Sequence, residues 1–151
     1  MKSRDSGNRA ARERADRCVE SILAGHRIII RESGNAHEEG LEDAVYSRGP
    51  LQGLVNAGDF IDDPFDYAAQ AMERISTMHP FAEGNKRTAF FAALRILNWA
   101  EFTLPDTEGT YRFVLETSMG MHGVDEIRVW LRDNAVALPG KDDCRGPRLS
   151  P

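Results

Sequence analysis

Residues 89–99 are the part of the sequence that most constrains the fold. This stretch, AFFAALRILNW, is almost wholly apolar. A helix on a protein surface carries one apolar stripe, whereas a helix that is apolar all round is buried. We therefore expect a central helix from Asn85 to about Ala100, with other elements packed around it.

Start and stop signals predict the helix that precedes it. Asp63 is suited to cap a helix, and Pro64 is suited to the first helical position. The apolar residues that follow have helical spacing until Pro80 interrupts them. We therefore expect a helix over 64–78. Similar patterns predict four more helices, over 9–24, 38–47, 106–119 and 125–134.

Between the first helices, the pattern predicts irregular segments. Gly25 is expected to end the first helix. The run Ile28–Ile30 is interpreted as a short strand or a buried loop segment, and residues 53–62, which are interrupted by glycines, as a surface flap. The sum of these elements is an all-α fold, a compact helical bundle around one buried central helix.

Composition bounds the class of protein. Hydrophobic residues make up 41% of the 151 residues, which is enough for one core. We divide the chain into an N-terminal helical extension (1–30), a main domain (31–138) and a flexible tail (139–151). The formal net charge of −5 argues against direct nucleic-acid binding. The cysteines, Cys18 and Cys144, do not suggest a disulfide framework, and no apolar run is long enough for a membrane span. We expect a cytoplasmic protein.

The segment HPFAEGNKRT, which enters the central helix, predicts an anion site. A helix N-terminus carries unpaired N–H groups and a partial positive charge. Gly84 lets the backbone approach an anion closely, and Asn85, Lys86 and Arg87 fill the first turn. Each residue alone is adequately explained as a cap or a surface charge. Two cations at a helix N-terminus oppose the dipole, however, so together they indicate a bound anion.

Two neighbouring residues add chemistry to this site. Glu83 offers a hard oxygen ligand, which suits a magnesium ion shared with phosphates. His79 lies at the end of the preceding helix, where it could act as a general base. The segment is not a Walker A loop, because no glycine lies at position 79.

The segment resembles the signature of the Fic/Doc family, and within it the death-on-curing (Doc) toxin branch. The Fic form reads H-P-F-x-[DE]-G-N-G-R-x-x-R, and the Doc form H-x-F-x-[DE]-x-N-K-R-T. Lys86 replaces the second glycine of the Fic form, and Phe90 stands where its final arginine would be. Both departures favour the Doc form. The resemblance extends over about Gly34 to Leu138.

The resemblance implies a helical-bundle fold and the transfer of part of ATP onto a protein hydroxyl. By position, His79 would deprotonate the hydroxyl and Glu83 would hold magnesium. Phosphate oxygens would be bound by Asn85, Lys86 and Arg87, with backbone N–H groups at Ala82 and Gly84; Lys86 and Arg87 would also assist catalysis, and Phe81 would anchor the loop in the core. Doc-like members move the γ-phosphate to elongation factor Tu and arrest translation.

Several alternatives stay open. Fic-type AMP transfer is the second enzymatic reading, and a non-catalytic nucleotide-binding regulator is the main non-enzymatic one. Because no [ST]-x-x-x-E-[GN] inhibitory motif follows Ser33, we expect a Phd-like antitoxin in trans rather than inhibition in cis. The resemblance implies that the flap docks the protein target as an added strand, and an ordinary mobile loop is the alternative interpretation. Of the other histidines, His26, His37 and His122 are interpreted as loop or turn residues. Trp99 and Trp130 are assigned to the core.

Overall fold

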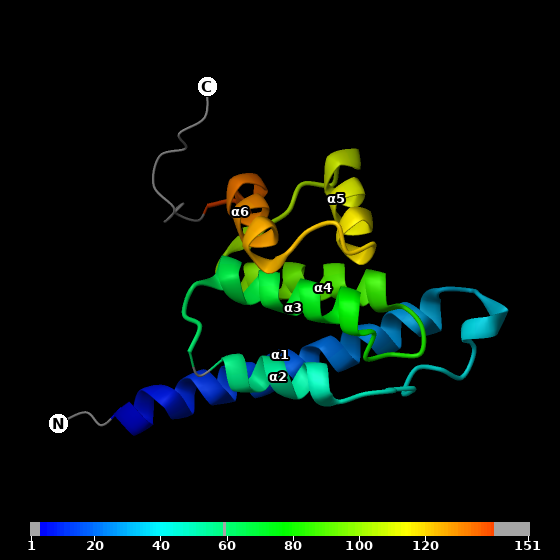
Figure 1. Cartoon of the computed structure of the whole chain (residues 1–151), viewed down its shortest axis with the longest axis horizontal. Helices are drawn as coiled ribbons and strands as arrows, with labels where there is room; N and C mark the ends of the chain where they lie inside the picture. The colour runs from blue at the N-terminus through cyan, green and yellow to red at the C-terminus, as the bar shows by residue number, and fades with distance from the viewer. Residues whose placement is uncertain (1–3, 59, 141–151) are drawn as a thin grey trace.

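The fold is built from pairs of helices in three layers. We analysed a computed structural model that describes residues 4–58 and 60–140. In Figure 1, α5 and α6 lie on one side, α3 and α4 in the middle, and α1 and α2 on the other side. The helices of the described residues are α1 (Arg4–Glu32), α2 (Gly49–Ala57), α3 (Pro64–Met78), α4 (Asn85–Trp99), α5 (Glu108–Ser118) and α6 (Val124–Asn134). The prediction of an all-α bundle is confirmed.

Short elements complete the described chain. A 3₁₀ turn, η1, spans Ala36–Glu38. Strands β1 (Phe102–Thr103) and β2 (Val136–Ala137) pair antiparallel, with Phe102 opposite Ala137. This small sheet ties the chain after α4 to the chain after α6.

Helix α3 begins and ends where the local signals predict. The Asp63 carboxylate accepts from the Phe65 N–H at 3.0 Å, and Pro64 occupies the first helical position. The helix ends at Met78, and His79 after it adopts the left-handed conformation with φ +48°. A non-glycine residue with positive φ is uncommon, so the turn that follows α3 places His79 in a restricted backbone geometry.

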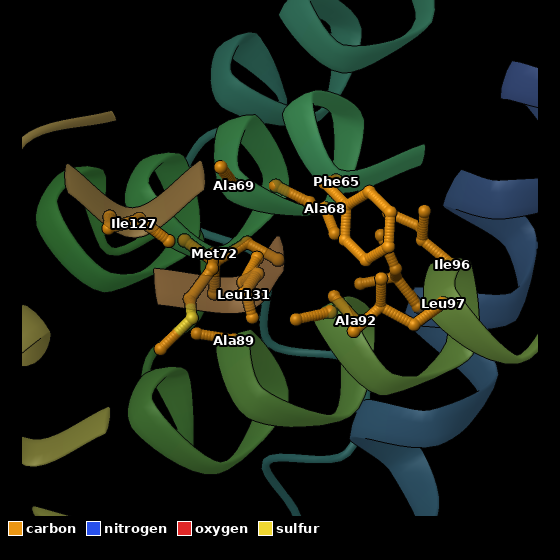
Figure 2. Close-up of a cluster of buried hydrophobic side chains, with 14 of the residues drawn as sticks. Phe65, Ala68, Ala69, Met72, Ala89, Ala92, Ile96, Leu97, Ile127 and Leu131 are labelled. Carbon is orange, nitrogen blue, oxygen red and sulfur yellow. The ribbon is translucent and has the colours of Figure 1, made fainter. Parts of the chain in front are cut away.

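The core lies between α3, α4 and α6. Figure 2 shows Met72 of α3, Ala89 of α4 and Leu131 of α6 pointing toward one another. All three side chains are buried. Helix α4 is apolar on most of its surface but is not buried on every face, because Trp99 is 46% exposed. The assignment of Trp99 to the core is therefore wrong, whereas Trp130 is partly buried and stacks on Phe113 at 4.1 Å.

The first helix is longer than predicted, and Gly25 does not end it. Helix α1 continues through Gly25 and through Ile28–Ile30, which is neither strand nor loop. A Cβ atom at Gly25 would lie only 2.1 Å from Cε1 of Phe91. Glycine is therefore present because α1 and α4 approach closely here, a packing role rather than a helix-ending one.

Two further local predictions are wrong. In place of the helix expected over 38–47, the chain has the end of η1, turns at 39–40 and 42–43, and then residues 44–47, here called the extended segment, in which Val45 forms an isolated antiparallel bridge with Phe81. The first half of the flap expected over 53–62 belongs to helix α2, which ends at Ala57 and buries Leu51, Leu54 and Val55, while residue 59 of the expected flap lies outside the described residues. The extended segment beside the signature loop is therefore 44–47, and not the glycine-containing segment.

The last helices show smaller differences. Helix α5 begins at Glu108, two residues later than predicted, and is capped by Thr107, whose side chain accepts from the Thr110 N–H. Tyr111 and Leu115 are about half exposed, whereas the inward face of α5 carries Phe113 and Val114. Among the described helices, none has the length and apolar character needed to cross a bilayer.

Candidate phosphate-transfer site

The candidate site is the loop 79–84 together with the first turn of α4. The loop joins α3 to α4 beside the C-terminal half of α1 (Figure 1). Gly84 precedes the helix with φ +81°, a conformation that suits glycine, and no side chain caps this end of the helix. The first backbone bond of the helix runs from the Thr88 N–H to the Gly84 carbonyl. The amides of residues 85–87 are therefore left as potential donors to an anion.

Asn85 shapes the loop with its side chain. Its Oδ1 accepts from the Phe81 N–H at 3.0 Å, and its Nδ2 donates to the Phe81 carbonyl at 2.9 Å. This pair of bonds closes the loop across four residues. The Asn85 side chain is thus committed to the backbone, so its contribution to an anion comes through its N–H group.

The loop is also paired with the extended segment 44–47. The Tyr46 N–H donates to the Pro80 carbonyl at 2.7 Å, and the Ala82 N–H donates to the Ala44 carbonyl at 3.0 Å. The Ala82 amide is therefore already satisfied and is not a free donor to phosphate, contrary to the expectation from the sequence. In the described residues no hydrogen bond uses the Gly84 N–H, which leaves it available.

The cations of the first turn differ in their surroundings. Lys86 is exposed and has no ion-pair partner within the described part of the chain. Arg87 donates through Nη2 to Oε1 of Glu38, while its side chain stays 41% exposed. Glu38 is 2% exposed. Both cations are thus accessible to solvent at the N-terminus of α4, and the ion pair with Glu38 fixes the position of the Arg87 side chain.

The environment of Glu38 keeps it ionised. Hydrogen bonds from Ser33, then from Asn35 and Arg87, lower the pKa of its carboxyl group to about 2, and burial acts in the opposite direction. The Asn35 amide donates to Oε2 at 3.0 Å. Sequence reasoning did not single out Glu38, because its partner Arg87 is 49 residues away in the chain.

The oxygen ligands beside the loop fit a magnesium ion. Ligand atoms of His37, Glu38 and Glu83 all lie within 4.8 Å of one another. Glu38 accepts a hydrogen bond at each oxygen, whereas no hydrogen bond to the Glu83 carboxylate is found among the described residues, so Glu83 is the less engaged of the two carboxylates. One protein carboxylate together with phosphate oxygens and water is a normal magnesium environment.

The histidines are placed differently from one another. His79 is exposed at the start of the loop, on the solvent side. His37 is exposed near Glu83, whereas His122 lies between Glu116 and Glu126 on the α5–α6 connection. His26 was interpreted as a turn residue, which is wrong: it is buried in α1, directly beneath the loop.

A signal for His26 was present in the sequence. Ala15, Cys18, Ile22, His26 and Ile30 follow helical spacing and are all buried. Reading this stripe through Gly25 places His26 on the inward face of one long helix. A polar side chain on such a face needs hydrogen-bond partners, which points to a specific contact.

Comparison with known protein families gives a match over the part of the chain that contains the loop. Residues 17–97 match the Fic/DOC family, a range that includes α1 from Arg17 onward, α3, the loop and most of α4. No curated protein matched the chain. Because the family match covers more than half of the sequence, this protein belongs to the Fic/DOC family.

Proposed function

We propose that this protein is a Doc-like kinase that transfers the γ-phosphate of ATP to a serine or threonine hydroxyl of a target protein. Enzymes of the Fic/DOC family transfer nucleotide-derived groups to proteins. The observation that carries the finer proposal is Lys86, an exposed cation in the first turn of α4 that has no ion-pair partner among the residues the structure describes. Where Fic-type signatures have glycine, this chain has an additional charge.

Lys86 favours transfer of a terminal phosphate. A glycine at this position leaves room for a phosphate chain that continues past the reacting phosphorus. A lysine side chain fills that room and adds a positive charge next to the oxygens of the transferred group. Phosphoryl transfer depends mainly on positioning and charge stabilisation, so a cation here serves the γ-phosphoryl group directly.

The reaction assigns a role to each residue of the loop. His79 accepts the proton of the target hydroxyl as its oxygen forms a bond to the γ-phosphorus, and the bond from that phosphorus to the bridging oxygen breaks to release ADP. Lys86, Arg87 and the N–H groups of Gly84 and the first helical turn bind phosphate oxygens. Glu83 would hold magnesium, which neutralises phosphate charge.

The exposed position of His79 suits a protein substrate. It lies at the end of α3 next to the loop, where a hydroxyl presented from outside can approach. The neighbouring segment 44–47 is extended, and Tyr46 in it is 78% exposed. A substrate peptide could add to this segment as a strand, which is a recurrent mode of peptide recognition.

The proposal includes a role as the toxin of a toxin–antitoxin pair. In that setting the target would be a translation factor such as elongation factor Tu, and a Phd-like antitoxin would silence the protein in trans. Expression of the wild-type chain should then stop growth, and His79→Ala should not. Equal growth of cells that express the two proteins would contradict the toxin role.

A paired labelling assay tests the transferred group. Purified protein is incubated with cell extract and magnesium, using ATP labelled on either the γ- or the α-phosphate. We expect a labelled protein band with the γ label alone, lost in His79→Ala and kept in the matched control His122→Ala. A band with the α label would identify AMP transfer and overturn the role given to Lys86.

The variant Lys86→Gly tests the discriminating residue. We expect it to lower γ-phosphate transfer by about 10-fold or more, as for removal of one group that stabilises transition-state charge. Full kinase activity in Lys86→Gly would contradict the argument. Absence of both labels from every band, in an extract that contains the translation machinery, would favour the nucleotide-binding regulator.

A further inference from the structure

His26 connects α1 to the signature loop through Nε2, while its other ring nitrogen faces the chain at Glu42. The side chain is 1% exposed and comes from the buried face of α1. Its Nε2 lies 2.9 Å from the Glu83 carbonyl oxygen, and its Nδ1 lies 3.1 Å from the Glu42 carbonyl oxygen. A neutral imidazole carries one N–H group, and with its hydrogen on Nε2 the ring donates to the Glu83 carbonyl. The ring thus lies between three segments: α1, the chain that leads into the extended segment, and the loop.

The ring is also held by stacking. It lies 3.8 Å from the Phe81 ring with an angle of 11° between the planes, and Phe81 is buried. Its Cδ2 would be 3.7 Å from a Cβ atom at Gly84. His26 therefore contacts the middle of the loop, at Phe81, and its end, at the backbone of Glu83 and Gly84.

His26 differs from the other groups that bind the loop backbone. Pro80 and Ala82 pair with the backbone of the extended segment, and Asn85 belongs to the first turn of α4 itself. Among the described residues, His26 is the only side chain from outside 79–85 that forms a hydrogen bond to the loop backbone. It is thus the side-chain link between the main scaffold and the loop.

The Glu83 carbonyl fixes the direction of the next N–H group. A trans peptide is planar, and its C=O and N–H groups point in opposite directions. Because the Glu83 oxygen points down to His26, the Gly84 N–H points away from α1. This amide has no hydrogen-bond partner in the described chain, and it precedes the free N–H groups of α4.

We propose that His26 is a positioning residue that aims the Gly84 N–H at the phosphoryl group. The inference rests on the proposed phosphoryl transfer for its catalytic consequence, but not for the geometry. Without the bond to the Glu83 carbonyl, the Glu83–Gly84 peptide is free to rotate, because glycine accepts a wide range of φ. A donor that turns away stabilises less of the charge that develops during transfer.

The effect belongs mainly to the chemical step. Lys86, Arg87 and the amides of α4 still bind the phosphates of ATP when one donor is misdirected. An interaction that is strongest in the transition state lowers kcat when it is lost, with a smaller change in KM. We therefore expect loss of the His26 bond to lower kcat by about 10- to 100-fold and to change the KM for ATP by less than about 3-fold.

Two amide substitutions separate the ring nitrogens. The Nε2 of a glutamine lies near the position of histidine Nε2, whereas the amide of an asparagine reaches only the position of Nδ1. His26→Gln therefore keeps a donor toward the Glu83 carbonyl, and His26→Asn does not. Both remove the ring, so a purely structural role of the ring predicts equal effects. We expect kcat of His26→Gln within about 5-fold of wild type and a much larger loss in His26→Asn.

A third variant keeps the ring and removes the bond. His26→Phe preserves an aromatic ring that can stack on Phe81 but offers no donor. We expect it to fold, as judged by circular dichroism and thermal unfolding, and to show the same loss of kcat as His26→Asn. Wild-type kcat in His26→Phe would overturn the proposal, and so would equal losses in His26→Gln and His26→Asn.

A binding readout tests the geometry independently of transfer. The amide resonance of Gly84 is followed by NMR while ATP with magnesium is added to the wild type and to His26→Phe. We expect a large shift in the wild type and less than half of it in the variant. If the wild type binds ATP but transfers no label, the proposed function fails. The change in the Gly84 amide resonance still tests the role of His26 in that case, because it requires only ATP binding. Equal shifts in both proteins would overturn it.

Discussion

Arg87 and Glu38 form an ion pair at the edge of the phosphate loop, in which Nη2 of Arg87 donates to Oε1 of Glu38. Glu38 is buried, whereas the Arg87 side chain is 41% exposed. The pair therefore joins a fixed anion to a cation that reaches the site. One guanidinium nitrogen is used by Glu38, and the rest of the fork is left for phosphate oxygens.

Glu38→Gln should destabilise the protein in a pH-dependent way. At pH 7 the variant loses a charge-assisted hydrogen bond, for which we expect a cost of about 1–2 kcal/mol. The pKa of Glu38 is lowered from 4.5 to about 2 in the folded state, so its stabilising effect is present above pH 4.5 and is lost as the pH falls toward 2. The difference in the free energy of unfolding between wild type and variant should therefore decrease as the pH falls from 4.5 toward 2.

Urea unfolding at several pH values between 7 and 3 measures that difference. Glu39→Gln is the matched control, because Glu39 is the exposed neighbour of Glu38. Its free energy of unfolding should stay within about 0.5 kcal/mol of wild type. A cost of Glu38→Gln that does not change with pH would contradict the assignment.

Gly25→Ala should destabilise the protein although alanine is the better helix former. The added Cβ would meet Phe91 Cε1 at 2.1 Å, so α1 and α4 must separate or the ring must move. Overpacking of this kind costs about 1–3 kcal/mol, against a gain of about 1 kcal/mol in helix propensity. Phe91→Leu in the same chain removes the ring and should restore part of the loss. Thermal unfolding of the single and double variants tests this, and a stabilised Gly25→Ala would refute the close approach.

Thr88→Val should leave the protein as stable as wild type or stabilise it by about 1 kcal/mol. The Thr88 hydroxyl is fully buried and has no hydrogen-bond partner within residues 4–58 and 60–140, so its removal relieves a desolvated polar group. The matched control is Thr117→Val, because the Thr117 hydroxyl is equally buried but donates to the Phe113 carbonyl at 2.8 Å. That variant should lose stability. Equal changes in the urea midpoint of the two variants would contradict this reading of Thr88.

Cys18 should be inert in the folded protein. Burial raises the pKa of its thiol to about 12, partly opposed by a hydrogen bond with Tyr67. In a Cys144→Ser background, a thiol reagent at pH 8 should label Cys18 only as fast as the protein unfolds. Because the folded pKa is raised above 9.0, the stability that the buried thiol contributes should fall as the pH rises from 9 toward 12. Rapid labelling of Cys18 without denaturant would show that solvent reaches its thiol in the folded protein, and would contradict this prediction.

Local signals in the sequence determined much of the site. Asp63 and Pro64 start α3, and Gly84 with its positive φ starts α4, so the polar loop between them lies at a helix N-terminus. Caps, prolines and glycines act within a few residues of their own position. For that reason the presence of this loop, with His79 at its start and two cations after it, could be predicted without the tertiary structure.

Tertiary packing decided what surrounds the loop. Gly25 continues a helix because Phe91 lies against it, and residues 49–57 are helical because their apolar side chains are buried. His26 reaches the Glu83 carbonyl across 57 residues of sequence. Such contacts join segments that are far apart in the sequence. Local signals such as caps and helical spacing do not predict which distant segments pack together, so these contacts are known only from the tertiary structure.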